Sequence, residues 1–168
     1  MMNNTILPRN FYERPTLTVA GELLGKMLKF ANFSEIITEV EAYIGMDDPA
    51  CHAARGYTNR TSVMFGTPGF SYVYFMYGMY YYPNIVTEVE GFPAAVLIRG
   101  LKLTEPLEAN LGGPGILCKK LNITKEHNKQ DLTISHEFCL YEYHLKPEWL
   151  YCIELIVHVN QSKFTQLI

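Results

Sequence analysis

Residues 70–86 read FSYVYFMYGMYYYPNIV, and this stretch decides the fold. It holds two runs dense in Tyr, Val and Phe, residues 70–76 and 79–86, which are typical of β-strands. Tyr77-Gly78 stands between them, and the glycine supplies the positive φ that a tight connection requires. The stretch therefore predicts a β-hairpin that carries Tyr77 near its tip.

The residues before the hairpin predict a helix and a further strand. Thr16 is a capping residue, and apolar residues at helical spacing follow it, so we expect a helix over 17–29. Residues 35–44 alternate, which is typical of a strand with two different faces. We expect the core face to hold Ile36, Thr38, Val40, Ala42 and Ile44. The opposite face then carries Ile37, Glu39, Glu41 and Tyr43.

The residues after the hairpin complete the predicted domain. Residues 94–101 are mostly apolar and predict a strand, Gly112-Gly113-Pro114-Gly115 predicts a loop, and 117–121 predict a short helix. No internal repeat or linker divides the chain. We predict one α+β domain, a curved antiparallel β-sheet with flanking helices and a protruding β-hairpin. Residues 1–10 are assigned to a flexible N-terminal arm and 11–168 to the domain.

Composition sets the class of protein. The chain has 168 residues, which fits one domain, and 48% hydrophobic with 18% charged residues is a globular composition. No uninterrupted apolar stretch is long enough to span a bilayer. Residues 1–10 lack a basic region followed by an apolar run, so we expect neither secretion nor a membrane partner.

The metal-ligating residue types are scattered. Cys51, Cys118, Cys139 and Cys152 form no CxxC pair, which disfavours a zinc site or a disulfide scaffold. His52 has no second histidine within metal-ligand spacing. We expect reduced thiols and no metal.

Charge is unevenly distributed along the sequence. The formal net charge of −3 by itself argues against a nucleic-acid partner, because binding phosphates requires Lys and Arg. Local distribution matters more than the total, however. Residues 119–129 carry four lysines, including Lys119 and Lys120, against one acid, and Arg55 and Arg60 form a second basic spot. A local basic face within an acidic protein is expected.

Two features of the predicted sheet can carry chemistry, namely a group of tyrosines and Glu41. Cross-strand packing accounts for most tyrosines at 72–82, but flat rings with polar tips are also suited to stacking on nucleic-acid bases. A glutamate on a strand face is usually only solvated. Beside Tyr43, however, the Glu41 carboxylate is expected to be partly desolvated, a setting in which it can act as a general base.

A set of motifs follows in a fixed order along the chain: EVEAYIG at 39–45 followed by His52, MFGTPG at 64–69, YVYFMYGMY at 72–80 followed by Asn84, AVLIR at 95–99, EPLE at 105–108, GPG at 113–115 and the weaker QDL at 130–132. This ordered set resembles the alkyladenine (3-methyladenine) DNA glycosylase family. The resemblance covers residues 17–132. The sequence departs from the family at Ile116, where relatives usually carry Lys, and from about residue 133, where the family's closing segment has no clear counterpart.

The resemblance implies a role for each pocket residue. Glu41 resembles the base that activates water, and Arg99 resembles the residue that helps hold that water. Tyr43 resembles the stacking wall on one side of an extruded base, and His52 with Tyr74 resembles the other wall.

The resemblance also implies contacts with DNA. Asn84 resembles the amide that crowds the pocket floor and disfavours normal guanine, and Tyr77 resembles the wedge that fills the gap left in the duplex. The candidates for further DNA contacts are the basic residues Arg55, Arg60, Lys119 and Lys120.

The implied function is that of a monofunctional DNA glycosylase in base excision repair. It would hydrolyse the N-glycosidic bond of alkylated purines in duplex DNA, as a monomer without a cofactor, in the bacterial cytoplasm or a eukaryotic nucleus. No lysine stands at or beside position 41, so a Schiff-base lyase is not suggested. Two alternatives stay open: a catalytically impaired module that binds DNA lesions, and a glycoside or nucleoside hydrolase that acts on small molecules through Glu39 and Glu41 as paired carboxylates.

Overall fold

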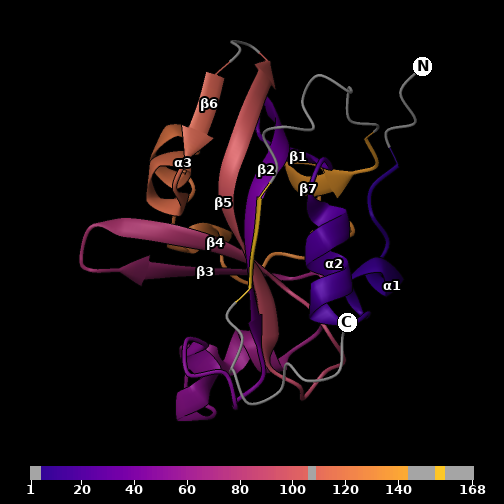
Figure 1. The fold of residues 1–168 in the computed structure, drawn as a ribbon. Coiled ribbons are helices and arrows are strands. Elements are labelled where there is room, and N and C mark those ends of the chain that lie inside the picture. The colour runs from indigo at the N-terminus through magenta and orange to yellow at the C-terminus, as the bar shows by residue number, and fades with distance from the viewer. Residues whose placement is uncertain (1–4, 106–108, 144–153, 158–168) are drawn as a thin grey trace.

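A curled antiparallel sheet with helices packed on it forms the body of the protein (Figure 1). The computed structural model describes residues 5–105, 109–143 and 154–157. The helices and 3-10 turns are α1 (Arg9–Tyr12), α2 (Thr16–Leu23), η1 (His52–Arg55), η2 (Thr61–Phe65), α3 (Pro114–Leu121) and η3 (Lys125–His127). The strands are β1 (Met27–Phe30), β2 (Phe33–Ile44), β3 (Ser71–Met76), β4 (Tyr80–Val86), β5 (Ala94–Glu105), β6 (Ala109–Gly112), β7 (Phe138–Tyr141) and β8 (Glu154–Val157). The predicted α+β class is confirmed.

The sheet brings together strands that are distant in the chain. Its order is β3-β4-β5-β2-β1-β7, with β6 paired to β5 and β8 to β2. The β2–β8 pair is parallel, and the other described pairs are antiparallel. The two long strands, β2 and β5, lie at the centre. Residues on β2, β4 and β5 therefore meet across adjacent strands.

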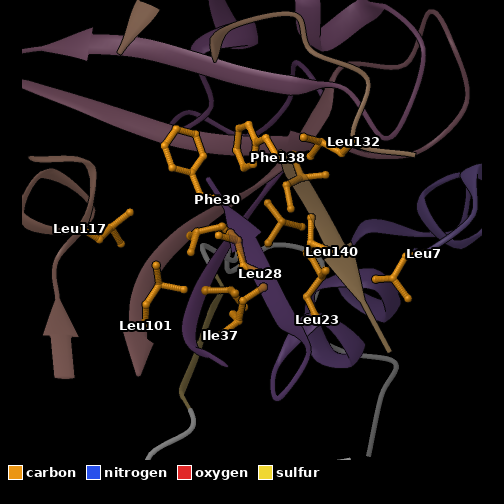
Figure 2. Packing of buried hydrophobic residues seen from close by; sticks show 14 of the residues in the cluster. Leu7, Leu23, Leu28, Phe30, Ile37, Leu101, Leu117, Leu132, Phe138 and Leu140 are labelled. Carbon is orange, nitrogen blue, oxygen red and sulfur yellow. The ribbon is translucent and has the colours of Figure 1, made fainter. Parts of the chain in front are cut away.

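The main core lies between one face of the sheet and the helices. It joins Leu23 of α2, Ile37 of β2, Leu101 of β5 and Leu117 of α3, and Figure 2 shows these side chains packed with those of β1 and β7. Burial of such aliphatic side chains is the main term that stabilises the fold. A second, smaller cluster packs η1 and η2 against β3 and β4, and it supports the other face of the sheet.

The predicted hairpin is confirmed. Strands β3 and β4 pair from Ser71 with Ile85 to Met76 with Tyr80. Tyr77 and Gly78 occupy the turn, both with positive φ, at 53° and 68°. The hairpin projects from the sheet in Figure 1.

The expected flexible arm over 1–10 is not found for residues 5–10. Leu7 is buried in the core, and its N–H donates to the carbonyl of Leu140. Arg9 begins α1, donates to the Pro68 carbonyl at 2.6 Å and pairs with Asp131. An apolar anchor and an ion pair thus fix this segment. Residues 1–4 lie outside the described residues.

The helix expected over 17–29 is shorter than predicted. α2 ends at Leu23, Gly25 takes a φ of 82°, and Met27–Phe30 form β1 between β2 and β7. The glycine allows the chain to leave the helix in the left-handed region, and sheet pairing then outweighs the helical spacing of the apolar residues. The expected loop at 112–115 also differs, because Pro114 opens α3 and Gly113 precedes it. Proline suits the first helical position because its missing N–H needs no partner there.

Two β-bulges change the predicted faces of β2. Ile37 pairs with Leu101 and Glu39 with Gly100, so Thr38 is an extra residue on β2. Val40 then pairs with Ile98, so Arg99 is an extra residue on β5. The alternation therefore shifts at Thr38, and Ile37 lies in the main core together with Val40 and Ala42. Glu39, Glu41 and Tyr43 keep the opposite face, as predicted.

Candidate active site

A pocket opens on the face of the sheet opposite the main core. It is lined by side chains from β2, β3 and β4 and from the segment that contains η1 and η2, namely Tyr43, Ala50, His52, Met64, Tyr72, Tyr74, Met76 and Asn84. The pocket and its mouth contain about 310 Å³ that no protein atom fills. Its lining is mostly aromatic and apolar, with a few polar groups, which is typical of a site for a small ring system. The pocket contains all four predicted substrate-binding residues.

One wall is a hydrogen-bonded group of rings. The His52 and Tyr74 ring centroids lie 4.2 Å apart at 69°, and His52 Nδ1 lies 3.1 Å from the Tyr72 hydroxyl. Burial, together with the charges of Arg60 and Arg55, lowers the pKa of His52 to about 4. Burial raises the pKa of Tyr72 to about 12. The wall is therefore uncharged at neutral pH.

The Glu41 carboxylate is connected to this pocket through Tyr43. Only 4% of Glu41 is exposed, and burying a carboxylate is costly unless it is paired and hydrogen-bonded. The hydroxyl of Tyr43, which lines the pocket, donates to Glu41 Oε1 at 2.8 Å. Arg99 Nη1 donates to Glu41 Oε2 at 2.5 Å. The two predicted catalytic residues are thus in direct contact, and a carboxylate oxygen can accept more than one hydrogen bond.

The bulge on β5 aims Arg99 at this carboxylate. Gly100 follows it, and a Cβ there would lie 2.9 Å from both Glu39 Cβ and Thr38 Oγ1, so glycine permits the close approach of β2 and β5. Arg99 Nε also donates to Glu39 Oε1 at 2.8 Å. Desolvation lowers the pKa of Arg99, but the hydrogen bonds to Glu39 and Glu41 outweigh it and raise the pKa. Arg99 is a permanent cation shared between two carboxylates.

Asn84 is buried and fixed by the backbone. Its Nδ2 donates to the Tyr72 carbonyl at 3.1 Å and to the Tyr82 carbonyl at 3.2 Å. Because both partners only accept, the amide nitrogen must face them, and Oδ1 is the amide atom that these two bonds leave available. Asn84 therefore gives the pocket a rigid polar group.

The predicted DNA contacts lie outside the pocket. Tyr77, at the hairpin tip, is 80% exposed. Arg55 and Arg60 line a wide cleft that shares His52 and Met76 with the pocket. Lys119 and Lys120 lie on α3, and Figure 1 shows α3 and the η1–η2 segment on either side of the hairpin. The four basic residues are exposed and flank the hairpin in two groups rather than forming one cluster.

Three features of the site were not anticipated from the sequence. Tyr72 binds His52, Glu39 binds Arg99, and Arg60 stacks over the Tyr74 ring with its guanidinium carbon 5.0 Å from the centroid. Tyr72 could have been found, because it shares a strand face with Tyr74 two residues on. The other two contacts depend on the bulge and on the path of a loop, which leave no local signal.

The described residues offer neither a metal-binding group nor a membrane-spanning helix. Within residues 5–105, 109–143 and 154–157, no three His, Cys, Asp or Glu side chains are placed to hold a metal ion together. No helix in the same ranges has the length and apolar character needed to cross a membrane.

The site thus combines an aromatic pocket with a buried carboxylate, on a sheet that also projects a hairpin. A pocket of this kind is suited to binding a flat ring. Comparison with known proteins identifies the class as the DNA glycosylases. The family model for methylpurine-DNA glycosylase matches residues 10–152, and the chain belongs to this family. The match runs past residue 132, where the motif resemblance ended.

Relatives cover nearly the whole chain. A protein of Wolbachia pipientis subsp. Culex pipiens (strain wPip) is 87% identical over 163 residues, 97% of this chain and 89% of the relative. A Sodalis glossinidius protein is 62% identical over 163 residues, 97% of this chain and 96% of the relative. A Rickettsia felis protein is 58% identical over 146 residues, 86% of this chain and 82% of the relative. Each of the three is named "Putative 3-methyladenine DNA glycosylase".

Proposed function

We propose that this protein excises alkylated purines from duplex DNA by hydrolysis of the N-glycosidic bond, as a monofunctional glycosylase in base excision repair. The observation that carries the proposal is the buried Glu41 carboxylate, which is held by Arg99 and by Tyr43, a residue that lines the aromatic pocket. A base within a duplex is inaccessible, so the lesion must be flipped into this pocket before it reacts.

In the proposed reaction Glu41 acts as the general base. It takes a proton from a water whose oxygen attacks C1′ of the sugar, and the C1′–N bond breaks with its electron pair leaving on the base. The products are an abasic sugar and the free purine. Arg99 holds one carboxylate oxygen, which fixes the direction in which Glu41 presents its lone pairs.

The pocket walls suit an alkylated purine. Alkylated purines are often cationic, and electron-rich rings such as Tyr43 and Tyr74 attract cations. The lowered pKa of His52 keeps the imidazole itself uncharged, so that this ring does not repel such a base. A cationic purine is also a good leaving group, so one carboxylate and one water suffice without a general acid.

The exposed hairpin tip supports the flipping step. Tyr77 projects into solvent, and aromatic or apolar side chains of this kind wedge into the minor groove and unstack base steps. The basic groups on either side of the hairpin would contact phosphates. We place the protein with DNA in the cytoplasm, acting as a monomer.

The test is a product assay on methylated duplex DNA. We expect the protein to generate abasic sites, seen as strand breaks only after alkali treatment, because the described residues that line the pocket include no lysine to form a Schiff base. Glu41→Gln is expected to lose excision by about 100- to 10,000-fold and to retain lesion binding.

The same assay distinguishes the alternatives. Lesion binding by the wild type without abasic product would indicate a binding module instead. Strand breaks before alkali would indicate a lyase. A wild-type rate in Glu41→Gln would remove this residue from the mechanism.

A further inference from the structure

Glu39 is the second carboxylate on Arg99, and the proposed reaction does not use it. Glu39 Oε1 accepts from Arg99 Nε at 2.8 Å, while Glu41 Oε2 accepts from Nη1 at 2.5 Å. The two acids therefore bind two different edges of one guanidinium. This arrangement arises because the bulge at Arg99 places its side chain between two residues of β2 that share a face.

The pairing of Glu39 with Arg99 contributes little to stability. The Glu39 and Arg99 side chains are 24% and 32% exposed, and ion pairs that reach water are screened and add little to stability. Glu41, in contrast, is almost entirely buried. The contact at Glu39 is thus better explained by what it does to the geometry of Arg99 than by what it adds to the fold.

An arginine facing a single carboxylate tends to bind it through two parallel hydrogen bonds. In this site such a fork would occupy both Glu41 oxygens, where Tyr43 already binds Oε1. Glu39 instead holds Nε, which restrains the plane of the guanidinium, and Nη1 binds one oxygen of Glu41. Glu39 thereby helps to set the oxygen of Glu41 that the guanidinium meets and the direction from which it approaches.

We propose that Glu39 is a positioning residue for the reaction: it holds the Arg99 guanidinium in the orientation in which Nη1 binds Oε2 of the catalytic base Glu41. The inference rests on the proposed function. Glu39 acts through Arg99 and touches neither the base nor the water. Its effect must therefore depend on Arg99 being present.

The test is a double-mutant cycle measured by single-turnover excision from a duplex that carries one methylated purine. Glu39→Ala is expected to slow excision roughly 10- to 100-fold, the effect expected when a charge-assisted hydrogen bond is removed. Glu39→Gln keeps an oxygen acceptor for Nε and is expected to be several-fold faster than Glu39→Ala. The combined Glu39→Ala/Arg99→Ala variant is expected to match Arg99→Ala alone, because the two residues act as one unit.

The control is Glu22→Ala, which removes an exposed ion-paired glutamate on α2, far from the pocket along the chain. It is expected to excise at the wild-type rate.

Additive losses of rate in the double-mutant cycle, or a Glu39→Ala rate within twofold of wild type, would overturn the inference. If Glu41→Gln is inactive while Glu39→Ala is not slowed, only the role of Glu39 fails. If the wild type forms no abasic product, the proposed function and the role of Glu39 both fail.

Discussion

The Tyr43 hydroxyl donates a hydrogen bond to Glu41 Oε1 at 2.8 Å, so one residue serves both as pocket wall and as partner of the carboxylate. Burial, the hydrogen bond and the negative charge of Glu41 raise the pKa of Tyr43 above its ordinary value. Tyr43 therefore stays protonated and can only donate to Glu41. The geometry couples the position of the carboxylate to the ring on which a base would stack.

Tyr43→Phe separates these two roles. The ring remains, so lesion binding should be retained, while removal of the hydrogen bond to a charged group should slow single-turnover excision roughly 10- to 100-fold. Binding is measured with Glu41→Gln as the background, so that no product forms. Tyr141→Phe, on β7 and outside the pocket lining, is the matched control. A loss of binding equal to the loss of rate would mean that the hydroxyl serves recognition rather than the base.

His52 should titrate well below the ordinary imidazole value. Its pKa is lowered to about 4, so the folded protein binds fewer protons than the unfolded chain between pH 4 and 6.5. The stability that His52 contributes is complete above pH 6.5 and is lost as pH falls toward 4. An NMR titration of the His52 ring should show a midpoint near 4 and no change near 6.5. A midpoint near 6.5 would show that the wall becomes charged in mildly acidic conditions.

The local patterns predicted the hairpin and the face that carries Glu41 and Tyr43, because these depend on neighbours in the sequence, whereas the roles of His52, Tyr74 and Asn84 in the pocket were implied by the family resemblance. Strand propensity and a glycine placed Tyr77 at the tip, and the i, i+2 rule placed Glu39, Glu41 and Tyr43 on one face. Contacts between distant segments were not predictable in this way. The burial of Leu7 requires β7, which follows more than a hundred residues later.

The faces of β2 show why strict alternation fails. A single extra residue at Thr38 reverses the phase of the strand, so Ile37 enters the core, and nothing in the sequence marks that position. Glu35, which the sequence places in a run rich in acids, is fully buried on the same strand. The bulge depends on the partner strand, where Gly100 leaves room for it.

Glu35 should make stability depend on pH in the opposite sense to His52. Neither of its carboxylate oxygens has a hydrogen-bond partner among the described residues, and burial raises its pKa to about 8. The folded state therefore binds more protons than the unfolded chain between pH 4.5 and 8. The stability that Glu35 contributes is thus complete below pH 4.5 and is lost as pH rises toward 8. Glu35→Leu should remove this decline and raise the free energy of unfolding at pH 8 by a few kcal/mol. The free energy of unfolding is measured by denaturation between pH 5 and 8 for the wild type and for Glu35→Leu. The same dependence on pH in both proteins would contradict this prediction.

Affinity for DNA should fall steeply with salt despite the net charge of −3. Arg55 and Arg60 on one side of the hairpin, and Lys119 and Lys120 on the other, are exposed and can reach phosphates. Each phosphate that the protein neutralises releases counterions, and this release makes affinity depend on salt. Replacing Lys119 and Lys120 with Gln should therefore make the plot of log affinity against log salt concentration less steep, by about one unit of slope for each phosphate that is no longer bound. Lys26→Gln, which removes a lysine already paired with Glu142, is the control. Affinity that is independent of salt would argue against a phosphate-binding face.

Tyr77 combines a strained backbone with an exposed ring. Its φ of 53° lies in the left-handed region, which a bulky residue rarely adopts, and 80% of the residue faces solvent. Strain of this kind costs about 1–3 kcal/mol and is typical of functional positions. The Met79 N–H donates to the Met76 carbonyl, so Tyr77 and Gly78 are the two central residues of a β-turn in which both have positive φ. Asn-Gly is the preferred pair at such positions, so Tyr77→Asn should leave the melting temperature unchanged or raise it. The absence of a ring that stacks in the duplex should lower excision from paired DNA roughly tenfold to a hundredfold. The decrease should be smaller when the lesion faces a mismatch, where flipping is easier. If Tyr77 only packs across the strands, Tyr77→Asn will instead lower the melting temperature and leave the ratio of paired to mismatched activity unchanged, and both quantities can be measured on the same preparation.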